Sequence, residues 1–253
     1  MTPESVLDDV APTNFFSRLM GVYFSPGETF KEIGRKPTFI VPLLTLMLLG
    51  GLSTFAMIDR ITVAKFLGPG IEQAVAKNQM SQEEANKRLD QLASRAIWIK
   101  AGFFGVGLVQ WIFIPLILAG IFKLISMVMG TDNQFKAVYA VTVYAMLAVS
   151  LISILVFITT LYLKPLDEIE IENLSMSNLG AWLNLLVGKD GLPKFIMSFA
   201  KWIDVFAIWI ISLLSIGYAA VSRKLKTSSV AFTLGGLYLV AALITSIFAA
   251  FNS

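Results

Sequence analysis

The sequence predicts an all-α protein that crosses a lipid bilayer as a bundle of about five transmembrane helices. Of its 253 residues, 56% are hydrophobic and only 15% are charged, whereas ordinary soluble domains carry about 25% charged residues. Five long stretches of the chain contain no Asp, Glu, Lys or Arg. A soluble protein of this length could not cover so much apolar surface with so few charges. Lipid is therefore the expected solvent for these stretches.

The five uncharged stretches define the expected spans. A helix rises 1.5 Å per residue, so about 20 residues cross a hydrocarbon core of about 30 Å. The stretch that begins at residue 205 is short for this purpose unless Trp202 and Ile203 join it. Helices satisfy the backbone groups within each span, and the stretches lack the alternation of barrel strands. The expected spans are about 37–58, 101–122, 137–163, 202–222 and 228–251.

Residues 1–36 precede the first span and are expected to form a cytoplasmic segment, with 37–253 forming the membrane domain. Apolar side chains in the first segment recur three and four residues apart, which places them on one helical face that can lie in the membrane interface. The turn at 25–27 then interrupts this helix, and a short charged helix is expected from Glu28. The candidate lipid contacts on the first helix are Phe15, Phe16, Leu19, Tyr23 and Phe24.

Two longer polar segments separate the spans. Within 59–100, Ser81 precedes Glu84 by three residues, which is the spacing of a capping box, and a helix is expected from there to about Arg95. The segment 164–204 is expected to be an irregular loop with a short amphipathic piece. At its end, Lys201 and Asp204 are expected at the water boundary of the fourth span.

The placement of basic residues favours a cytoplasmic amino terminus. Lys31, Arg35 and Lys36 crowd the amino side of the first span, and such residues concentrate on the cytoplasmic side of membrane proteins. The tightest turn between spans is purely basic and would lie on the same side. A simple count does not favour this orientation, because the two long polar segments opposite carry more Lys and Arg than the cytoplasmic side would. The candidate headgroup contacts in the tight turn are Arg223, Lys224 and Lys226.

The residue inventory predicts no catalytic, cofactor-binding or metal-ligating residue. The chain contains no cysteine and no histidine, which removes the usual zinc, haem and iron–sulfur ligands and histidine-based nucleophilic machinery. Glu83, Glu84 and Arg88 match the EExxxR pattern of CAAX-type glutamate proteases, but those enzymes place it in a membrane helix and use histidines. This segment is polar. No dense basic run is present, so nucleic acid is not an expected partner.

Gln110 and Tyr144 are the candidate polar contacts within the spans. Gln110 lies near the middle of the second span and is the most polar side chain at such depth. It either lines a polar pathway with Thr142 and Tyr144, as in a small permease or channel, or forms a hydrogen bond between helices. Small residues such as Gly50 and Gly51 allow close helix approach, either within the monomer or with a partner.

Several short motifs resemble those of a known family. They are Phe24-Ser25-Pro26-Gly27-Glu28-Thr29-Phe30, Lys36-Pro37, Pro42-Leu43-Leu44, Met129-Gly130, Phe135-Lys136-Ala137 and Tyr144. On these residues the chain resembles bacterial Yip-domain proteins, which are relatives of the eukaryotic membrane proteins that interact with Ypt/Rab GTPases. The resemblance covers roughly residues 15–250. Many members have a proline soon after the third-span tyrosine, but this chain reads Ala145-Met146-Leu147-Ala148, so a kinked third helix is not expected.

The resemblance implies a non-enzymatic membrane scaffold or adaptor that has no cofactor and acts through helix–helix and membrane-interface contacts. It also implies five spans, a cytoplasmic amino terminus and a place in the bacterial cytoplasmic (inner) membrane. The implied partners are the lipid bilayer and other membrane proteins, among them an export transporter, or a second copy of the chain. A small permease or channel stays the alternative function.

Overall fold

The computed structural model describes residues 14–131, 133–165, 176–188, 191–222 and 224–251. These residues form eleven α-helices and no strand, apart from one isolated antiparallel bridge between Asn178 and Asp204. The helices are α1 (Phe15–Phe24), α2 (Pro26–Arg35), α3 (Ile40–Arg60), α4 (Val63–Ala76), α5 (Gln82–Ser94), α6 (Ala96–Val128), α7 (Phe135–Leu163), α8 (Leu179–Val187), α9 (Lys194–Trp202), α10 (Val205–Ala220) and α11 (Thr227–Phe251).

Four helices in the described part of the chain, α3, α6, α7 and α11, are long and apolar enough to cross a bilayer. This confirms the predicted all-α membrane bundle. A fifth apolar helix, α10, has 16 residues, which extend over about 24 Å and so fall short of a hydrocarbon core of about 30 Å. The start of this helix differs from the expected 202–222, because Trp202 ends α9 and the chain breaks at Ile203 and Asp204.

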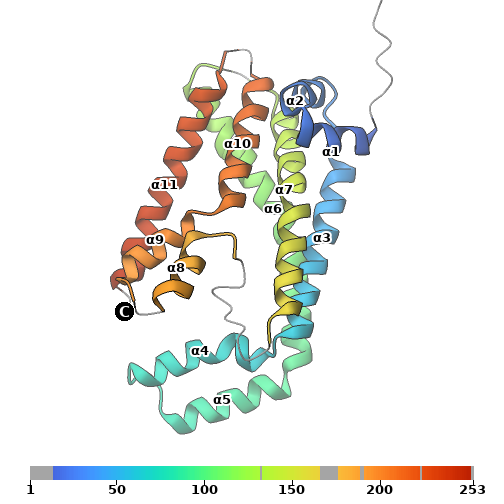
Figure 1. Ribbon diagram of the computed structural model, residues 1–253. Helices are drawn as coiled ribbons and strands as arrows, with labels where there is room; N and C mark the ends of the chain where they lie inside the picture. Colours follow the sequence, from blue (N-terminus) through green and yellow to red (C-terminus); the bar gives the residue numbers. More distant parts are fainter. Residues whose placement is uncertain (1–13, 132, 166–175, 189–190, 223, 252–253) are drawn as a thin grey trace, which may run out of the picture.

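Helix α7 lies at the centre of the bundle, and α1, α2, α3, α6 and α10 all pack against it (Figure 1). In its most apolar window 61% of the residues are buried, against 28%, 22% and 11% for α3, α6 and α11. Every residue from Ala137 to Ser150 is buried, and the helix runs unbroken past Tyr144, as expected from the missing proline. The other three spans are therefore much less enclosed by protein than α7 is.

Glycines let α3 and α6 approach closely at the middle of the bundle. A Cβ added to Gly50 would overlap the indole of Trp111, and one added to Gly107 would overlap the side chain of Thr54. These glycines therefore serve packing within the monomer. The glycine at 102, by contrast, faces open space.

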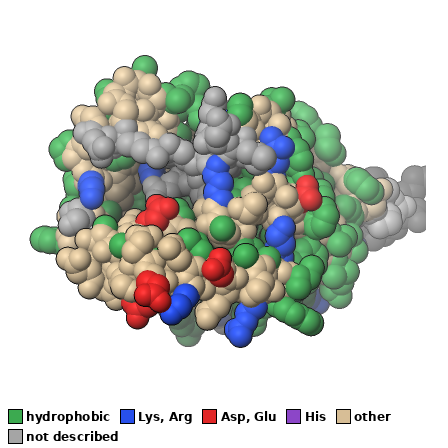
Figure 2. Space-filling model, turned by 90° about the horizontal axis from the view of Figure 1, so that it is seen from below, with side chains coloured by type: hydrophobic (Ala, Val, Ile, Leu, Met, Phe, Trp, Pro, Cys, Tyr) green, Lys and Arg blue, Asp and Glu red, His purple; other side chains and the backbone are tan. Residues whose placement is uncertain are grey.

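The two ends of the bundle differ in the charged residues that they carry. Helices α1 and α2 lie at one end with the α6–α7 and α10–α11 turns, and the α4–α5 hairpin lies at the other end (Figure 1). Seen from the α4–α5 end, Lys, Arg, Asp and Glu side chains are mixed among apolar ones (Figure 2). The first end, which we call the basic end, exposes several basic residues: Arg35, Lys36, Lys136, Lys224 and Lys226.

Both polar segments contain helices. The predicted capping box of α5 is confirmed: the Ser81 hydroxyl accepts from the backbone N–H of Glu84 at 3.2 Å, and the Glu84 carboxylate accepts from the N–H of Ser81 at 2.9 Å. The expectation for 164–204 is wrong in part, because this segment contains two helices, α8 and α9, instead of one short amphipathic piece. Asn178 caps α8 by accepting from the N–H of Ala181 at 2.8 Å.

We expect Gly50→Leu to destabilise the bundle, because the added side chain would occupy the space of the Trp111 indole. Overpacking of this kind costs about 1–3 kcal/mol. The thermal midpoint of the purified protein in detergent would measure the effect. Gly102→Leu is the matched control, since a Cβ there meets no atom within 4 Å. Equal midpoints for the two variants would show that α3 and α6 are not tightly packed at Gly50.

Candidate functional site

The first two helices form a compact hairpin at the basic end of the bundle. Asn14 begins α1 by accepting a hydrogen bond from the N–H of Ser17 at 2.9 Å. The chain turns at Ser25, where Pro26 opens α2, because a proline suits the first helical position. The Thr29 hydroxyl donates back to the carbonyl of Ser25 at 2.9 Å, which closes the turn. The predicted break after Phe24 is thus confirmed.

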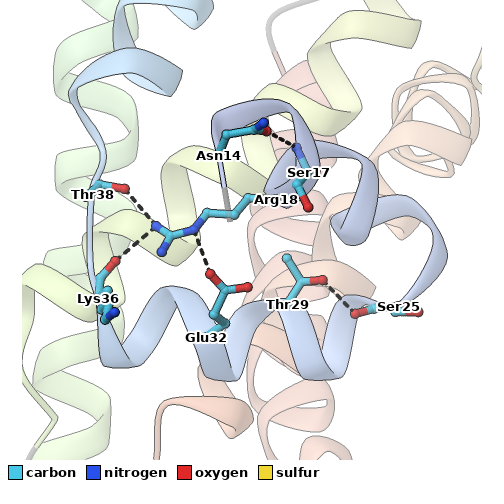
Figure 3. Close-up of polar contacts among 8 residues, drawn as sticks. All are labelled: Asn14, Ser17, Arg18, Ser25, Thr29, Glu32, Lys36 and Thr38. Carbon is cyan, nitrogen blue, oxygen red and sulfur yellow. Dashed lines mark hydrogen bonds and ion pairs between the residues drawn. The ribbon is translucent and has the colours of Figure 1, made fainter. Parts of the chain in front are cut away.

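Arg18 connects this hairpin to the membrane domain (Figure 3). Its side chain is buried, with 5% exposed, and it points from α1 toward the end of α2. The guanidinium donates from Nε to the Glu32 carboxylate at 3.0 Å, and from one terminal nitrogen to the carbonyl of Lys36 at 3.0 Å and the hydroxyl of Thr38 at 2.7 Å. One planar side chain therefore joins α1, α2 and the segment that leads into α3.

The five candidate lipid contacts on α1 divide between two faces. Leu19 is buried, and Tyr23 donates its phenolic hydrogen to the carbonyl of Ala148 in α7 at 2.6 Å. Burial raises the pKa of Tyr23 above that of a free tyrosine, so the phenol keeps the proton that it donates. Phe15 packs against the same core. The outer face carries Phe16 and Phe24, which are 71% and 77% exposed, together with Met20.

The basic turn lies beside the α6–α7 turn. The Lys224 ammonium reaches the carbonyl of Gly130 at 3.4 Å, and Lys224 and Lys226 are both exposed. Arg223, the third predicted headgroup contact, lies outside the described residues. The exposed cations of the turn and the exposed aromatic side chains of α1 thus occupy the same end of the bundle (Figure 1).

The predicted intramembrane polar residues do not come together. Gln110 is exposed on α6, whereas Tyr144 is buried in α7, where its ring centroid lies 6.3 Å from that of Phe15. Thr142 is also buried, and its hydroxyl pairs with that of Tyr218 in α10 at 2.7 Å. Thr142 and Tyr144 therefore contribute to the core, and Gln110 contributes to the outer surface of α6.

Sequence reasoning missed the part that Arg18 plays. A single arginine inside an otherwise apolar helix is the signal that could have pointed to it, because a charge is buried only when it is paired. Its partners lie 14 to 20 residues away. The helix is interrupted at Ser25, so the helical repeat does not carry over from α1 to these partners and they could not be found from spacing.

The fold defines the class of the protein: it is a polytopic α-helical membrane protein whose amino-terminal helical hairpin packs on the bundle. The Yip1 domain family model matches residues 20–250. The chain belongs to the Yip1 domain family, as the motifs at its first and third spans indicated. Comparison with curated proteins and with solved structures gave no match.

We expect Arg18→Ala to loosen the amino-terminal hairpin, because Glu32 and the carbonyl of Lys36 would lose a buried donor. The free energy that holds the hairpin in place should fall by about 2 kcal/mol. This is less than for a fully buried pair, because Glu32 keeps some exposure. Limited proteolysis between α1 and α3, together with the thermal midpoint in detergent, would report it. Lys31→Ala breaks only an exposed pair with Glu28 and is the control. If both variants resist protease equally, Arg18 does not hold the hairpin.

Proposed function

We propose that this protein is a non-enzymatic scaffold or adaptor in the bacterial inner membrane, and that it binds a neighbouring membrane protein through α6. The observation that carries the proposal is Gln110. Its amide is exposed on α6 and makes no hydrogen bond within the described part of the chain. A polar side chain in hydrocarbon without a partner is costly, and interhelical hydrogen bonds are the usual remedy.

The depth of Gln110 supports this proposal. The next residue, Trp111, packs on Gly50, which is the central residue of α3. Gln110 is therefore close to the middle of the bundle, far from water at either end. Its neighbours on the same helical face, at spacings of three, four and seven residues, are exposed and apolar: Val106 (65%), Phe113 (53%) and Ile117 (57%). An apolar stripe with one central amide suits a partner helix.

The partner is a second membrane protein or a second copy of the chain. An export-type transporter is one candidate. A second copy is another, because the glutamine amide is both donor and acceptor and can pair with its own kind across a two-fold axis. The basic end supports a cytoplasmic amino terminus, since exposed lysines there would meet the anionic inner leaflet. Phe16 and Phe24 would enter the same interface from α1.

A photo-crosslinking residue placed at Ile117 would test the α6 contact in the native membrane. We expect a protein adduct, identified by mass spectrometry as a transporter or as a second copy of the chain. In the Gln110→Leu background the adduct should fall about fivefold, because an interhelical hydrogen bond is worth about 1 kcal/mol. Leucine matches glutamine in size, so packing of α6 is preserved.

The control carries the same crosslinker at Leu239, an exposed residue of α11 with 53% exposure. We expect no dependence on Gln110 at that position. Lipid adducts alone at Ile117, or a protein adduct of equal yield in Gln110→Leu, would contradict the proposal.

We expect Lys224→Gln combined with Lys226→Gln to weaken binding of anionic lipid at the basic end. Each basic residue near a headgroup contributes about 1 kcal/mol, so the double variant should bind phosphatidylglycerol about thirtyfold more weakly, as measured by native mass spectrometry. Lys87→Gln is the control, because Lys87 lies on α5 at the other end and pairs with Glu83 at 2.9 Å. Equal lipid retention by the two variants would rule out the turn as a headgroup site.

A further inference from the structure

The chain breaks between α9 and α10 at the middle height of the bundle. The phenol of Tyr238 donates to the carbonyl of Trp202 at 2.7 Å, and the two rings contact each other with centroids 5.1 Å apart. Tyr238 is the twelfth of the 25 residues of α11, a helix long enough to span the bilayer. The break at Ile203 and Asp204 therefore lies near the centre of a membrane span.

The backbone at this break has its own hydrogen-bond partners. The N–H of Leu179 donates to the carbonyl of Ile203 at 2.9 Å, and the N–H of Val205 donates to the carbonyl of Ser177 at 3.0 Å. The Asp204 carboxylate accepts from the N–H of Ala207 at 3.0 Å and from the hydroxyl of Ser177. Irregular backbone is tolerated at membrane depth only when it is satisfied in this way.

Helix α9 packs along the carboxyl-terminal half of α11, and α8 packs on α9 (Figure 1). The two helices are closely packed, because a Cβ added to Gly180 of α8 would overlap the side chain of Lys201 in α9. In Figure 1 the α4–α5 hairpin lies farther out, beyond the end of α7. The α8–α9 pair is thus level with the spans, and the polar hairpin is not.

The outer face of α8 is apolar and has no partner among the described residues. Helix α8 has no charged residue, and its most exposed side chains are Leu186 at 79%, Leu185 at 64% and Trp182 at 54%. In water such a group would be an exposed apolar patch next to a bundle with few charges. Because α8 lies level with the spans, this apolar patch is next to acyl chains instead.

We infer that α8 and α9 form a re-entrant hairpin that inserts into the acyl-chain layer from the side on which α7 ends. The occupant of the α8 face is lipid hydrocarbon. Together with α10, which is too short to span alone, the hairpin completes the fourth crossing as a broken span. Lys194 and Lys201 are the charged residues of α9. Lys194 lies at the end of α9 away from the break, where its long stem lets the ammonium group reach toward the headgroups, and Lys201, next to the break, has an interaction within the protein. This inference does not depend on the proposed scaffold function.

The absence of cysteine from the chain allows a direct test with single thiols. Leu186→Cys would be reconstituted in phosphatidylethanolamine–phosphatidylglycerol liposomes. Freeze–thaw in the presence of a membrane-impermeant maleimide would place the reagent on both sides of the bilayer. We expect the thiol to react at least about tenfold more slowly than Asn86→Cys, which lies exposed on the polar helix α5. Leu239→Cys on α11 gives the reference rate for a lipid-facing position.

Protein packing cannot explain slow labelling at this position, because the protein itself leaves Leu186 largely uncovered. Full labelling in SDS would show that the thiol is present. A nitroxide on the same cysteine should collide often with oxygen and rarely with a water-soluble nickel chelate. Leu185→Cys serves if the first variant does not fold. A maleimide rate equal to that of Asn86→Cys, or a nitroxide as accessible to nickel as to oxygen, would overturn the re-entrant placement.

Discussion

A polar group that faces hydrocarbon needs a partner from the protein, and this constraint shapes most of the bundle. Hydroxyls within the spans donate to the carbonyl four residues earlier, as Thr142 does to Val138, Ser215 to Ile211 and Ser246 to Ala242. These bonds reduce the cost of a hydroxyl in an apolar surrounding by a partner within the same helix. The larger polar groups cannot be satisfied so locally, and they mark the places where the fold departs from a plain helical bundle.

Arg18 and Asp204 show two ways of holding a charge in such a protein. Arg18 gathers a carboxylate, a carbonyl and a hydroxyl around one guanidinium at the basic end, so the charge is paired where the chain leaves the interface. Asp204 instead accepts from the first turn of α10 and from Ser177 at the helix break. The first arrangement attaches the amino-terminal hairpin, and the second allows the chain to change direction between α9 and α10.

The distribution of burial among the spans agrees with a protein that works through its surface. Helix α7 is enclosed by its neighbours, with 61% of its most apolar stretch buried, whereas the buried share is 28% in α3, 22% in α6 and 11% in α11. A bundle with one central helix and exposed outer ones offers several faces to lipid and to other helices. Gln110 distinguishes the α6 face from the others, because it is an exposed amide among exposed apolar side chains, and the proposed partner helix would pair with it.

The amino-acid sequence by itself determined that lipid surrounds the apolar helices. It also determined four of the spans, the break at Ser25 and the cap at Ser81. These features depend on composition and on residues within a few positions of each other. Only the tertiary structure decided that Leu19 and Tyr23 turn inward while Phe16 and Phe24 stay exposed, that Gln110 faces outward, and that the chain breaks at Asp204. The physical reason is that protein interior and lipid are both apolar, so hydrophobicity does not show which side of a span faces the protein and which faces lipid. Contacts between distant residues make that choice.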